Sequence, residues 1–356
     1  MSQSTIVFTG GGTAGHVVVN LALIPEFINE GYEVHYIGSY EGIERELVEG
    51  IDGVTYHGIA TGKLRRYMSL ENMKDPFRIL KGVMQARNII KKLKPKIVFS
   101  KGGFVSVPVI MASRMAGVPS IIHESDYTPG LANKIATNFA KYILTTFPET
   151  NEHLPHKKAI NIGAIVRDEL FDGDLTRAEQ FTGFTKDKPT LLVMGGSAGA
   201  KSINEAVREA LPDLLAKYQI IHLCGKGKLD ESVKQTGYIQ FEYVTDELKD
   251  LLALSDVVAS RSGSNSIFEF LALKKPMLLI PLSRQVSRGD QILNAESFKK
   301  RSYAQVLEDE EVTSESFVKS VNELYNNRDQ YKQNMETYQP LKTKDDVIKL
   351  IKKTMK

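Results

Sequence analysis

Residues 5–16 read TIVFTGGGTAGH, a short β-rich run, Thr5–Thr9, that ends directly in glycines. Glycine lets the backbone turn tightly, and it lets backbone N–H groups approach an anion at the start of the following helix. Residues 17–29 continue as a helical stretch. This order of strand, glycine turn and helix is typical of the first unit of a Rossmann-like α/β fold.

Strands and helices alternate on both sides of the chain's midpoint. In the first half, further strands are expected at 33–38, 96–100, 119–123 and 142–146. The order restarts with TLLVM at 190–194 and the glycine-rich GGSAGAKS at 195–202, and strands are then expected at 219–224, 239–244, 257–260 and 276–280. Strands that alternate with helices predict a parallel sheet covered on both faces.

We therefore predict an α/β protein of two Rossmann-like domains whose parallel sheets face a cleft. The expected divisions are 1–163, 164–338 and 339–356, the last a basic amphipathic helix that packs back on the N-terminal domain. A length of 356 residues with 42% hydrophobic residues agrees with two domains of ordinary core size.

Composition also limits the cellular setting. The single cysteine, Cys224, cannot form an internal disulfide, so nothing indicates an oxidising compartment. The N-terminus lacks a basic stretch before an apolar run, and no apolar run approaches the roughly 18–20 residues that span a bilayer. We expect a cytoplasmic protein whose membrane contact is peripheral.

Each glycine loop matches a nucleotide-binding motif only in part. Gly10, Gly12 and Gly15 satisfy G-x-G-x-x-G, but the second strand ends without the acid that holds a ribose in nicotinamide sites. The second loop has Ala200 where a P-loop requires glycine. A nicotinamide cofactor and a phosphate-hydrolysing P-loop are therefore disfavoured, and a plain tight turn stays open as an alternative for the first loop.

The segment between Ala60 and Ser100 is strongly basic. This segment contains eleven basic residues and only two acidic ones, Glu71 and Asp75, so its net charge is +9. Apolar residues recur in it at spacings of three or four, at Leu70, Met73, Phe77, Leu80 and Met84. A basic amphipathic helix can lie on an anionic membrane, although part of such a stripe must pack on its own domain. The alternatives are a solvated helical face and, less favoured, RNA binding. Because aromatic residues are sparse and no nucleic-acid motif is present, we expect no nucleic-acid partner.

Six motifs occur in order along nearly the whole chain. They are GGGTAGH at 10–16, SKGGFVSVP at 100–108, HESD…PGLANK at 123–134, GGSAGA at 195–200, SRSGSNSIFEF at 260–270 and RGDQ…NA at 288–295. This set closely resembles the MurG family of GT-B glycosyltransferases, family 28. The resemblance implies transfer of N-acetylglucosamine from UDP-N-acetylglucosamine to the 4-hydroxyl of N-acetylmuramic acid in undecaprenyl-linked lipid I. The product would be lipid II for peptidoglycan synthesis.

The resemblance implies that the C-terminal domain binds the donor. Ser197 would contact the donor, the backbone of Val244 would recognise uracil, and Glu269 would bind the ribose hydroxyls. The other implied donor residues are Ser262 and Gly263 toward the diphosphate, Gln291 toward the sugar hydroxyls, and Arg167. Asp290 stands before Gln291 where the family often has a second glutamine.

The N-terminal domain would hold the acceptor, with Thr13, Ala14, Gly15 and His16 at the catalytic mouth. His16 is the preferred general base because an imidazole titrates near neutral pH. Its alternative role is to bind pyrophosphate or to order the loop. Glu124 and Asp126 are further candidate bases. Asp126 replaces the asparagine of better-known members, and an ionised aspartate cannot donate a hydrogen bond to the donor sugar.

No metal site is expected from the sequence. The only Asp-x-Asp match, Asp172-Gly173-Asp174, lies in a polar linker and is interpreted as a solvated turn. Helix N-termini and backbone N–H groups near 262–264 would stabilise the diphosphate leaving group instead. We therefore expect metal-independent transfer without a cofactor, and the resemblance implies inversion by direct displacement.

Three rival functions share parts of this pattern. A UDP-N-acetylglucosamine 2-epimerase would need acidic groups in the cleft and no membrane face. A non-enzymatic nucleotide-sugar sensor would bind the donor without turnover. A glycolipid-forming transferase, such as monogalactosyldiacylglycerol synthase, would take diacylglycerol as its acceptor.

Overall fold

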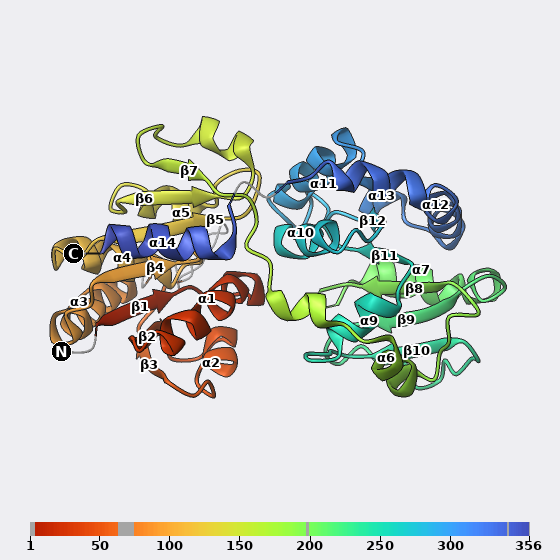
Figure 1. Cartoon of the computed structure of the whole chain (residues 1–356), viewed down its shortest axis with the longest axis horizontal. Helices are drawn as coiled ribbons and strands as arrows, with labels where there is room; N and C mark the ends of the chain where they lie inside the picture. The colour runs from red at the N-terminus through yellow and green to blue at the C-terminus, as the bar shows by residue number, and fades with distance from the viewer. Residues whose placement is uncertain (1–3, 63–74, 197–198, 340–341, 356) are drawn as a thin grey trace. The chain divides into compact units, whose positions relative to one another are not determined.

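The structure is a computed structural model, and it describes residues 4–62, 75–196, 199–339 and 342–355. The chain divides into two compact units, drawn in Figure 1. The N-terminal unit comprises Met1–Ile165 and Pro340–Lys356, and the C-terminal unit comprises Val166–Gln339. Within the described ranges, no helix is long and apolar enough to cross a membrane.

The N-terminal unit is built on a seven-stranded sheet in the order β3-β2-β1-β4-β5-β6-β7, with every neighbouring pair parallel. The strands are β1 (Thr5–Thr9), β2 (Glu33–Ser39), β3 (Val54–Ile59), β4 (Ile97–Ser100), β5 (Ser120–Glu124), β6 (Tyr142–Thr145) and β7 (Ala159–Asn161). The α-helices are α1 (Val18–Asn29), α2 (Ile43–Val48), α3 (Asp75–Leu93), α4 (Ser106–Met115), α5 (Leu131–Ala136) and α14 (Lys344–Thr354). The predicted parallel sheet is confirmed.

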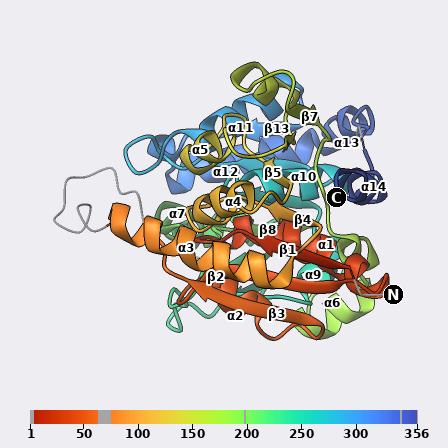
Figure 2. The same cartoon turned by 90° about the vertical axis from the view of Figure 1, so that its left-hand side faces the viewer.

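Helices cover both faces of this sheet. Side chains alternate along a strand, so Ile6 and Phe8 of β1 point to one face and Val7 points to the other. The first face is packed by α1 and α14, and the second by α3 and α4, which lie side by side (Figure 2). Burying each such side chain fully contributes about 1.5–3 kcal/mol relative to exposure. This packing fixes the strand ends from which the candidate site residues project.

The last helix, α14, is part of that core. Val347, Ile348 and Ile351 pack in the same cluster as Ile6 and Phe8. At its start, Lys344 Nζ lies 2.7 Å from Glu26 Oε1 on α1. The chain therefore returns to the N-terminal unit at its C-terminal end.

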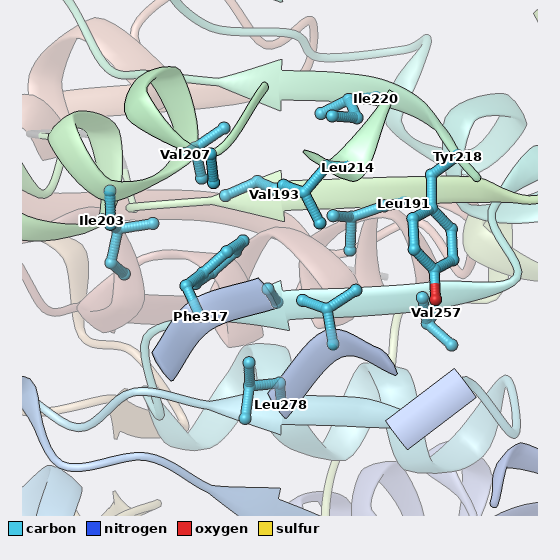
Figure 3. Close-up of a cluster of buried hydrophobic side chains, with 14 of the residues drawn as sticks. Leu191, Val193, Ile203, Val207, Leu214, Tyr218, Ile220, Val257, Leu278 and Phe317 are labelled. Atoms are coloured by element: carbon cyan, nitrogen blue, oxygen red, sulfur yellow. The ribbon is translucent and has the colours of Figure 1, made fainter. Parts of the chain in front are cut away.

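The C-terminal unit holds a six-stranded parallel sheet in the order β10-β9-β8-β11-β12-β13. Its strands are β8 (Thr190–Met194), β9 (Gln219–Leu223), β10 (Tyr238–Phe241), β11 (Val257–Ser260), β12 (Met277–Leu279) and β13 (Ala304–Val306). Its α-helices are α6 (Leu175–Thr182), α7 (Lys201–Glu209), α8 (Leu211–Leu214), α9 (Leu248–Leu254), α10 (Ser264–Ala272), α11 (Asp290–Lys300), α12 (Ser314–Asn326) and α13 (Arg328–Glu336). Figure 3 shows part of its core, where Val193 of β8, Val207 of α7 and Phe317 of α12 meet.

The sequence pattern missed three strands, β3, β7 and β13. β7 and β13 have three residues each, which is too short for an alternating pattern to be recognised. β3 lies at the sheet edge and is only partly buried, so its residues mix polar and apolar types. The predicted end of the strand at 239–244 was wrong. β10 stops at Phe241, and the chain then forms a loop before α9.

The Asp172-Gly173-Asp174 segment is a helix start rather than a solvated turn. Asp174 Oδ1 accepts a hydrogen bond of 2.8 Å from the backbone N–H of Arg177 and so caps α6. Gly173 has no room for a side chain, since a Cβ there would lie 2.3 Å from the Lys249 carbonyl oxygen. Local capping and packing account for this sequence.

Candidate active site

The first glycine loop, residues 10–16, connects β1 to a 3-10 turn, η1 (Ala14–His16), and then to α1. Gly10 and Gly12 have φ values of +153° and +86°, in the region that favours glycine. A Cβ on Gly10 would lie 2.4 Å from the His16 carbonyl oxygen. Gly10 and Gly12 therefore allow a tight loop that places residues 13–16 beyond the carboxyl end of β1.

His16 contacts the glycine loop through its Nδ1 atom. Its Nδ1 lies 3.1 Å from the Gly11 carbonyl oxygen and 3.0 Å from Thr13 Oγ1. Because a carbonyl oxygen only accepts hydrogen bonds, Nδ1 carries the proton of the neutral ring, and the lone pair is on Nε2. This tautomer is the one that a general base needs, with Nε2 as the proton acceptor.

A buried carboxylate, Glu44 on α2, fixes the same loop. Glu44 accepts hydrogen bonds from the backbone N–H of Gly12 (3.0 Å) and of Ser39 (3.1 Å), and from the Ser39 hydroxyl. A Cβ on Gly11 or Gly42 would lie within 2.7 Å of a Glu44 carboxylate atom. Gly11 and Gly42, from separate segments, thus leave room for this carboxylate. No sequence motif pointed to Glu44, since its partners meet it only in the folded protein.

Glu44→Gln tests this anchor. Burial raises the pKa of Glu44, but the hydrogen bonds from Ser39 and Gly12 outweigh burial and leave the pKa lowered. A lowered folded-state pKa stabilises the protein above the ordinary value of 4.5, and this contribution is lost as the pH falls through the folded-state pKa. We expect the variant to have a lower Tm at pH 7, and the deficit to shrink below pH 4.5.

Thermal unfolding at pH 7 down to pH 3 measures this deficit. Glu46→Gln is the matched control, because Glu46 lies on the same helix and is exposed. A Tm deficit for Glu44→Gln that stays the same at every pH would contradict an ionised Glu44 at the loop.

The carboxyl end of β5 carries the HESD residues. Glu124 is buried, and its carboxylate accepts from the backbone N–H of Asp126 (3.0 Å), the backbone N–H of Gly130 (2.9 Å) and Asn133 Nδ2 (2.9 Å). Burial raises the pKa of Glu124, as does the charge of Asp126. The role of Glu124 as a base stays a prediction. Two of its hydrogen bonds come from the loop that follows β5, and one comes from Asn133 on α5. They fit a role in shaping residues 125–130.

Two other residues of the HESD motif, Asp126 and His123, lie next to Glu124 in the sequence. Asp126 is half-buried, and the Thr150 hydroxyl donates to its carbonyl oxygen at 3.1 Å. His123 is buried, and burial, together with the positive charge of Lys101, holds its pKa well below the usual value. His123 is therefore a neutral core histidine rather than a proton carrier.

In the C-terminal unit, two predicted donor residues meet directly. Arg167 Nε lies 2.9 Å from Glu269 Oε1, and both side chains are largely buried, at 21% and 8% exposure. Glu269 lies within α10, and burial raises its pKa while Arg167 opposes that shift. The two residues are 102 positions apart, so only the fold reveals the pair.

Three further predicted residues gather at the start of α10. Gly263 is the N-cap residue of this helix. The Ser262 hydroxyl donates to the Gln291 carbonyl oxygen at 2.8 Å, and Gln291 Oε1 accepts from the backbone N–H of Leu282 at 3.1 Å. A helix N-terminus with its backbone N–H groups suits a diphosphate. The structure therefore brings Ser262, Gly263 and Gln291 together.

Two donor predictions remain, Val244 and Ser197. Val244 is buried in the loop between β10 and α9. Ser197 lies outside the described residues. Sequence reasoning missed Arg261, whose guanidinium contacts Asp309 Oδ1 at 2.8 Å and Ser202 Oγ at 3.1 Å. Arg261 thereby ties β11 to the start of α7, next to the second glycine loop.

Among the residues that the structure describes, no three His, Cys, Asp or Glu side chains are grouped so as to hold a metal ion. The ionisable groups near the candidate site are instead bound to protein partners, as Glu44, Glu124 and Glu269 are. The positive charges and backbone N–H groups described above are the features available to an anionic substrate.

Known proteins similar to this chain match both units. The N-terminal domain of glycosyltransferase family 28 matches residues 6–145, and the family's C-terminal domain matches residues 190–351. A relative from Oceanobacillus iheyensis is 58% identical over 355 residues, covering 100% of this chain and 99% of the relative. It is named UDP-N-acetylglucosamine–N-acetylmuramyl-(pentapeptide) pyrophosphoryl-undecaprenol N-acetylglucosamine transferase. A relative of the same name from Staphylococcus carnosus is 54% identical, covering 99% of this chain and 98% of the relative.

Solved structures agree with this grouping at the level of the fold. The crystal structure of Acinetobacter baumannii MurG has a TM-score of 0.75 at 23% identity, and the alignment covers 98% of this chain and 99% of that one. The kitacinnamycin glycotransferase has a TM-score of 0.74 at 16% identity, with 100% of both chains covered. Both family domains and the full-length relatives lead to one conclusion: this chain belongs to glycosyltransferase family 28.

Proposed function

We propose that this chain transfers N-acetylglucosamine from UDP-N-acetylglucosamine to undecaprenyl-pyrophosphoryl-N-acetylmuramyl-pentapeptide, forming the disaccharide lipid of peptidoglycan synthesis. The observation that carries the proposal is the 58% identity over the whole of both chains with a relative named for this reaction. The six motifs of the sequence and the Nδ1 contacts of His16 support the same chemistry.

The C-terminal unit is the proposed donor domain. Glu269, held by Arg167, accepts hydrogen bonds from the ribose hydroxyls of UDP, because an ionised carboxylate is an acceptor only. The start of α10, with Ser262 and Gly263, receives the diphosphate. Gln291 holds the sugar hydroxyls. Ser197 and the backbone of Val244 complete the donor contacts.

The N-terminal unit is the proposed acceptor domain. His16 Nε2 takes the proton of the acceptor 4-hydroxyl as that oxygen attacks the anomeric carbon of N-acetylglucosamine. The bond from this carbon to the diphosphate oxygen breaks, and UDP leaves with the bond's electron pair. Direct displacement inverts the anomeric centre. Thr13, Ala14 and Gly15 form part of the acceptor-binding site. Glu124 positions the loop that carries Asp126.

Transfer is proposed to need neither a metal nor a cofactor. Backbone N–H groups and the helix N-terminus at Ser262 and Gly263 stabilise the developing charge on the diphosphate, since preorganised dipoles do so without reorganisation. Arg261 keeps the adjacent segment rigid through Asp309 and Ser202.

Release of UDP from UDP-N-acetylglucosamine in EDTA tests the function, with and without a lipid I analogue. We expect release that depends on the analogue. Interconversion of the sugar nucleotide without transfer would indicate an epimerase, and binding without turnover would indicate a sensor. Transfer to diacylglycerol in place of the analogue would indicate a glycolipid synthase. Release that stops in EDTA and returns with a divalent cation would contradict metal-independence.

A membrane face on α3 is proposed to bring the enzyme to its lipid acceptor. Val83, Ala86 and Ile90 turn into the core, whereas Phe77, Leu80 and Met84 are 76%, 59% and 61% exposed. Residues of α3 and α4 line an apolar groove of about 640 Å³. The basic residues Arg78 and Lys81 are exposed beside it. Leu70 and Met73 of the predicted stripe lie outside the described residues. We infer peripheral association with the cytoplasmic face of an anionic membrane.

Phe77→Ser with Leu80→Ser is expected to reduce co-sedimentation with phosphatidylglycerol vesicles at least fivefold, because about 1.5–3 kcal/mol of apolar transfer is lost for each side chain that is fully inserted. Wild-type binding should also weaken as salt screens the basic residues. Leu229→Ser, at a half-exposed leucine of the C-terminal unit, is the control. Equal sedimentation of the double variant and the wild type would rule out this face.

A further inference from the structure

Arg261 is a largely buried arginine at the carboxyl end of β11, and its side chain is 11% exposed. Its Nη1 donates to Asp309 Oδ1 at 2.8 Å and to the carbonyl oxygens of Ile280 (3.2 Å) and Pro281 (3.4 Å). Its Nη2 donates to Ser202 Oγ at 3.1 Å. Both terminal nitrogens are therefore occupied by protein groups. These five residues form the Arg261 junction.

The Arg261 junction connects the ends of four neighbouring strands. The sheet order places β8, β11, β12 and β13 side by side. Ser202 lies at the start of α7 after β8, the two carbonyl groups follow β12, and Asp309 follows β13. Parallel strands bring their carboxyl ends to one edge of a sheet, so one side chain can reach all four segments. Arginine suits this place because its planar guanidinium group carries several donors in a fixed geometry.

Asp309 is the anion of the Arg261 junction, and its side chain is 14% exposed. Its Oδ1 also accepts from the Ser202 hydroxyl at 2.6 Å. Burial raises the pKa of Asp309, but the hydrogen bonds from Arg261 and Ser202 outweigh burial and leave the pKa below the ordinary value of 3.8. The next residue, Glu310, accepts from the Ser283 hydroxyl in the loop after β12. Asp309 and Arg261 thus form an ion pair that is largely shielded from water.

The Arg261 junction lies directly behind Gln291, the proposed ligand of the sugar hydroxyls. The Pro281 carbonyl oxygen accepts from Arg261, and the next backbone N–H, that of Leu282, donates to Gln291 Oε1 at 3.1 Å. On the other side, the hydroxyl of Ser262, the residue after Arg261, donates to the Gln291 carbonyl oxygen at 2.8 Å. Because Oε1 is bound to the backbone, Nε2 is the amide atom that can donate to a sugar oxygen. Arg261 therefore holds both segments that orient Gln291.

We propose that the Arg261–Asp309 pair is a positioning element that aligns Gln291 and the start of α10, and so sets the affinity for the diphosphate and sugar of the donor. The proposed uridine contacts belong to other places: Val244 lies in the loop before α9, and Glu269 is held by an ion pair of its own. This inference rests on the proposed glycosyl transfer, since it concerns the same donor.

Binding of the whole donor and of its nucleoside to Arg261→Met tests this role. Titration calorimetry gives the Kd of UDP-N-acetylglucosamine, and competition gives the Kd of uridine, both with the full chain. The variant is expected to raise the first Kd by about tenfold or more and the second by less than about twofold, because only the phosphate and sugar contacts lose their alignment. Equal weakening of both ligands, or no weakening of either, would overturn the proposal.

Asp309→Asn separates positioning from direct binding of the diphosphate by Arg261. If Arg261 acts through the loops, this variant also raises the Kd of UDP-N-acetylglucosamine, by about threefold or more, because the pair loses its charge. The double variant should bind the donor no more weakly than Arg261→Met alone, since two residues that act as one unit are not additive. Tighter or unchanged donor binding by Asp309→Asn would contradict the proposal, because a released Arg261 would then bind the diphosphate itself.

Two further variants control for charge and for stability. Arg261→Lys keeps the positive charge but loses the planar fork, so its donor affinity should stay near that of Arg261→Met. Wild-type affinity in the lysine variant would refute the role of the four-strand contact. Asp250→Asn weakens another ion pair of the same unit, in which Arg177 Nη2 lies 2.7 Å from Asp250 Oδ1. It should lower the Tm without changing the Kd of the donor, and an equal loss of donor affinity would count against the assignment.

A milder variant keeps the test decisive if Arg261→Met does not fold. Ser202→Ala removes the hydroxyl that bridges Asp309 and Arg261, and it should raise the Kd of UDP-N-acetylglucosamine by about two- to fivefold with uridine binding unchanged. Unchanged donor binding in both Ser202→Ala and Asp309→Asn would refute the role of the pair.

Acceptor-dependent UDP release by the wild type is measured first. Its absence would refute the proposed function, whereas normal release together with unchanged donor affinity in the variants would refute only the positioning role of Arg261 and Asp309.

Discussion

His16→Ala is expected to lower kcat by about 10²–10⁴-fold, the usual contribution of a positioned general base. The KM for UDP-N-acetylglucosamine should change little, because the proposed donor contacts belong to the C-terminal unit. The physical reason is the tautomer: Nδ1 donates to the Gly11 carbonyl oxygen, so Nε2 holds the lone pair that accepts the acceptor proton. Single-turnover UDP release, followed with saturating acceptor analogue, measures the effect.

His16→Asn separates catalysis from loop order. Its side-chain amide can replace the Nδ1–H donor toward Gly11 but cannot act as a base. We expect it to be as inactive as His16→Ala. If His16→Asn instead restores most of the rate, His16 orders the loop, and a raised acceptor KM with unchanged kcat would indicate pyrophosphate binding. His156→Ala, at an exposed histidine, is the control and should behave as wild type.

Arg167→Met is expected to have the largest effect on stability. It leaves the 8%-exposed Glu269 carboxylate without its cation, and breaking a buried pair in this way costs about 3–5 kcal/mol. For a unit of this size, the loss corresponds to a Tm decrease of roughly 6–20 °C. The KM for UDP-N-acetylglucosamine should rise as well, since Glu269 is the proposed ribose acceptor. Thermal unfolding of the full chain and donor titration measure the two effects.

The pH dependence of this variant has a definite sign. Burial raises the pKa of Glu269, and the loss of Arg167 raises it further. A carboxyl whose folded-state pKa is raised destabilises the fold as the pH rises through that pKa. The Tm deficit of Arg167→Met should therefore be smaller at pH 5 than at pH 8. Lys319→Ala, which breaks an exposed pair with Glu323, serves as the control and should leave the Tm nearly unchanged. A deficit equal to that of the control would show that Glu269 is not charged in the fold.

Features that depend on neighbouring residues could be predicted from the amino-acid sequence. Alternating strands and helices predicted both parallel sheets, and the glycines of residues 10–16 predicted a tight loop with His16 at its end. The three-to-four spacing of Phe77, Leu80 and Met84 predicted one helical face. These features are local, because backbone conformation and helical periodicity are set within a few residues.

Which distant groups lie close together, and how their pKa values shift, depends on the folded structure. Parallel strands bring their carboxyl ends to one edge of a sheet, so Glu44 reaches Gly12 and Lys101 reaches Ser125 across separate strands. The same packing joins Arg167 to Glu269 and gives Glu124 hydrogen bonds from the loop that follows β5. Burial and hydrogen-bond partners set these charges, and neither can be read from the order of residues, because each depends on contacts made across the fold.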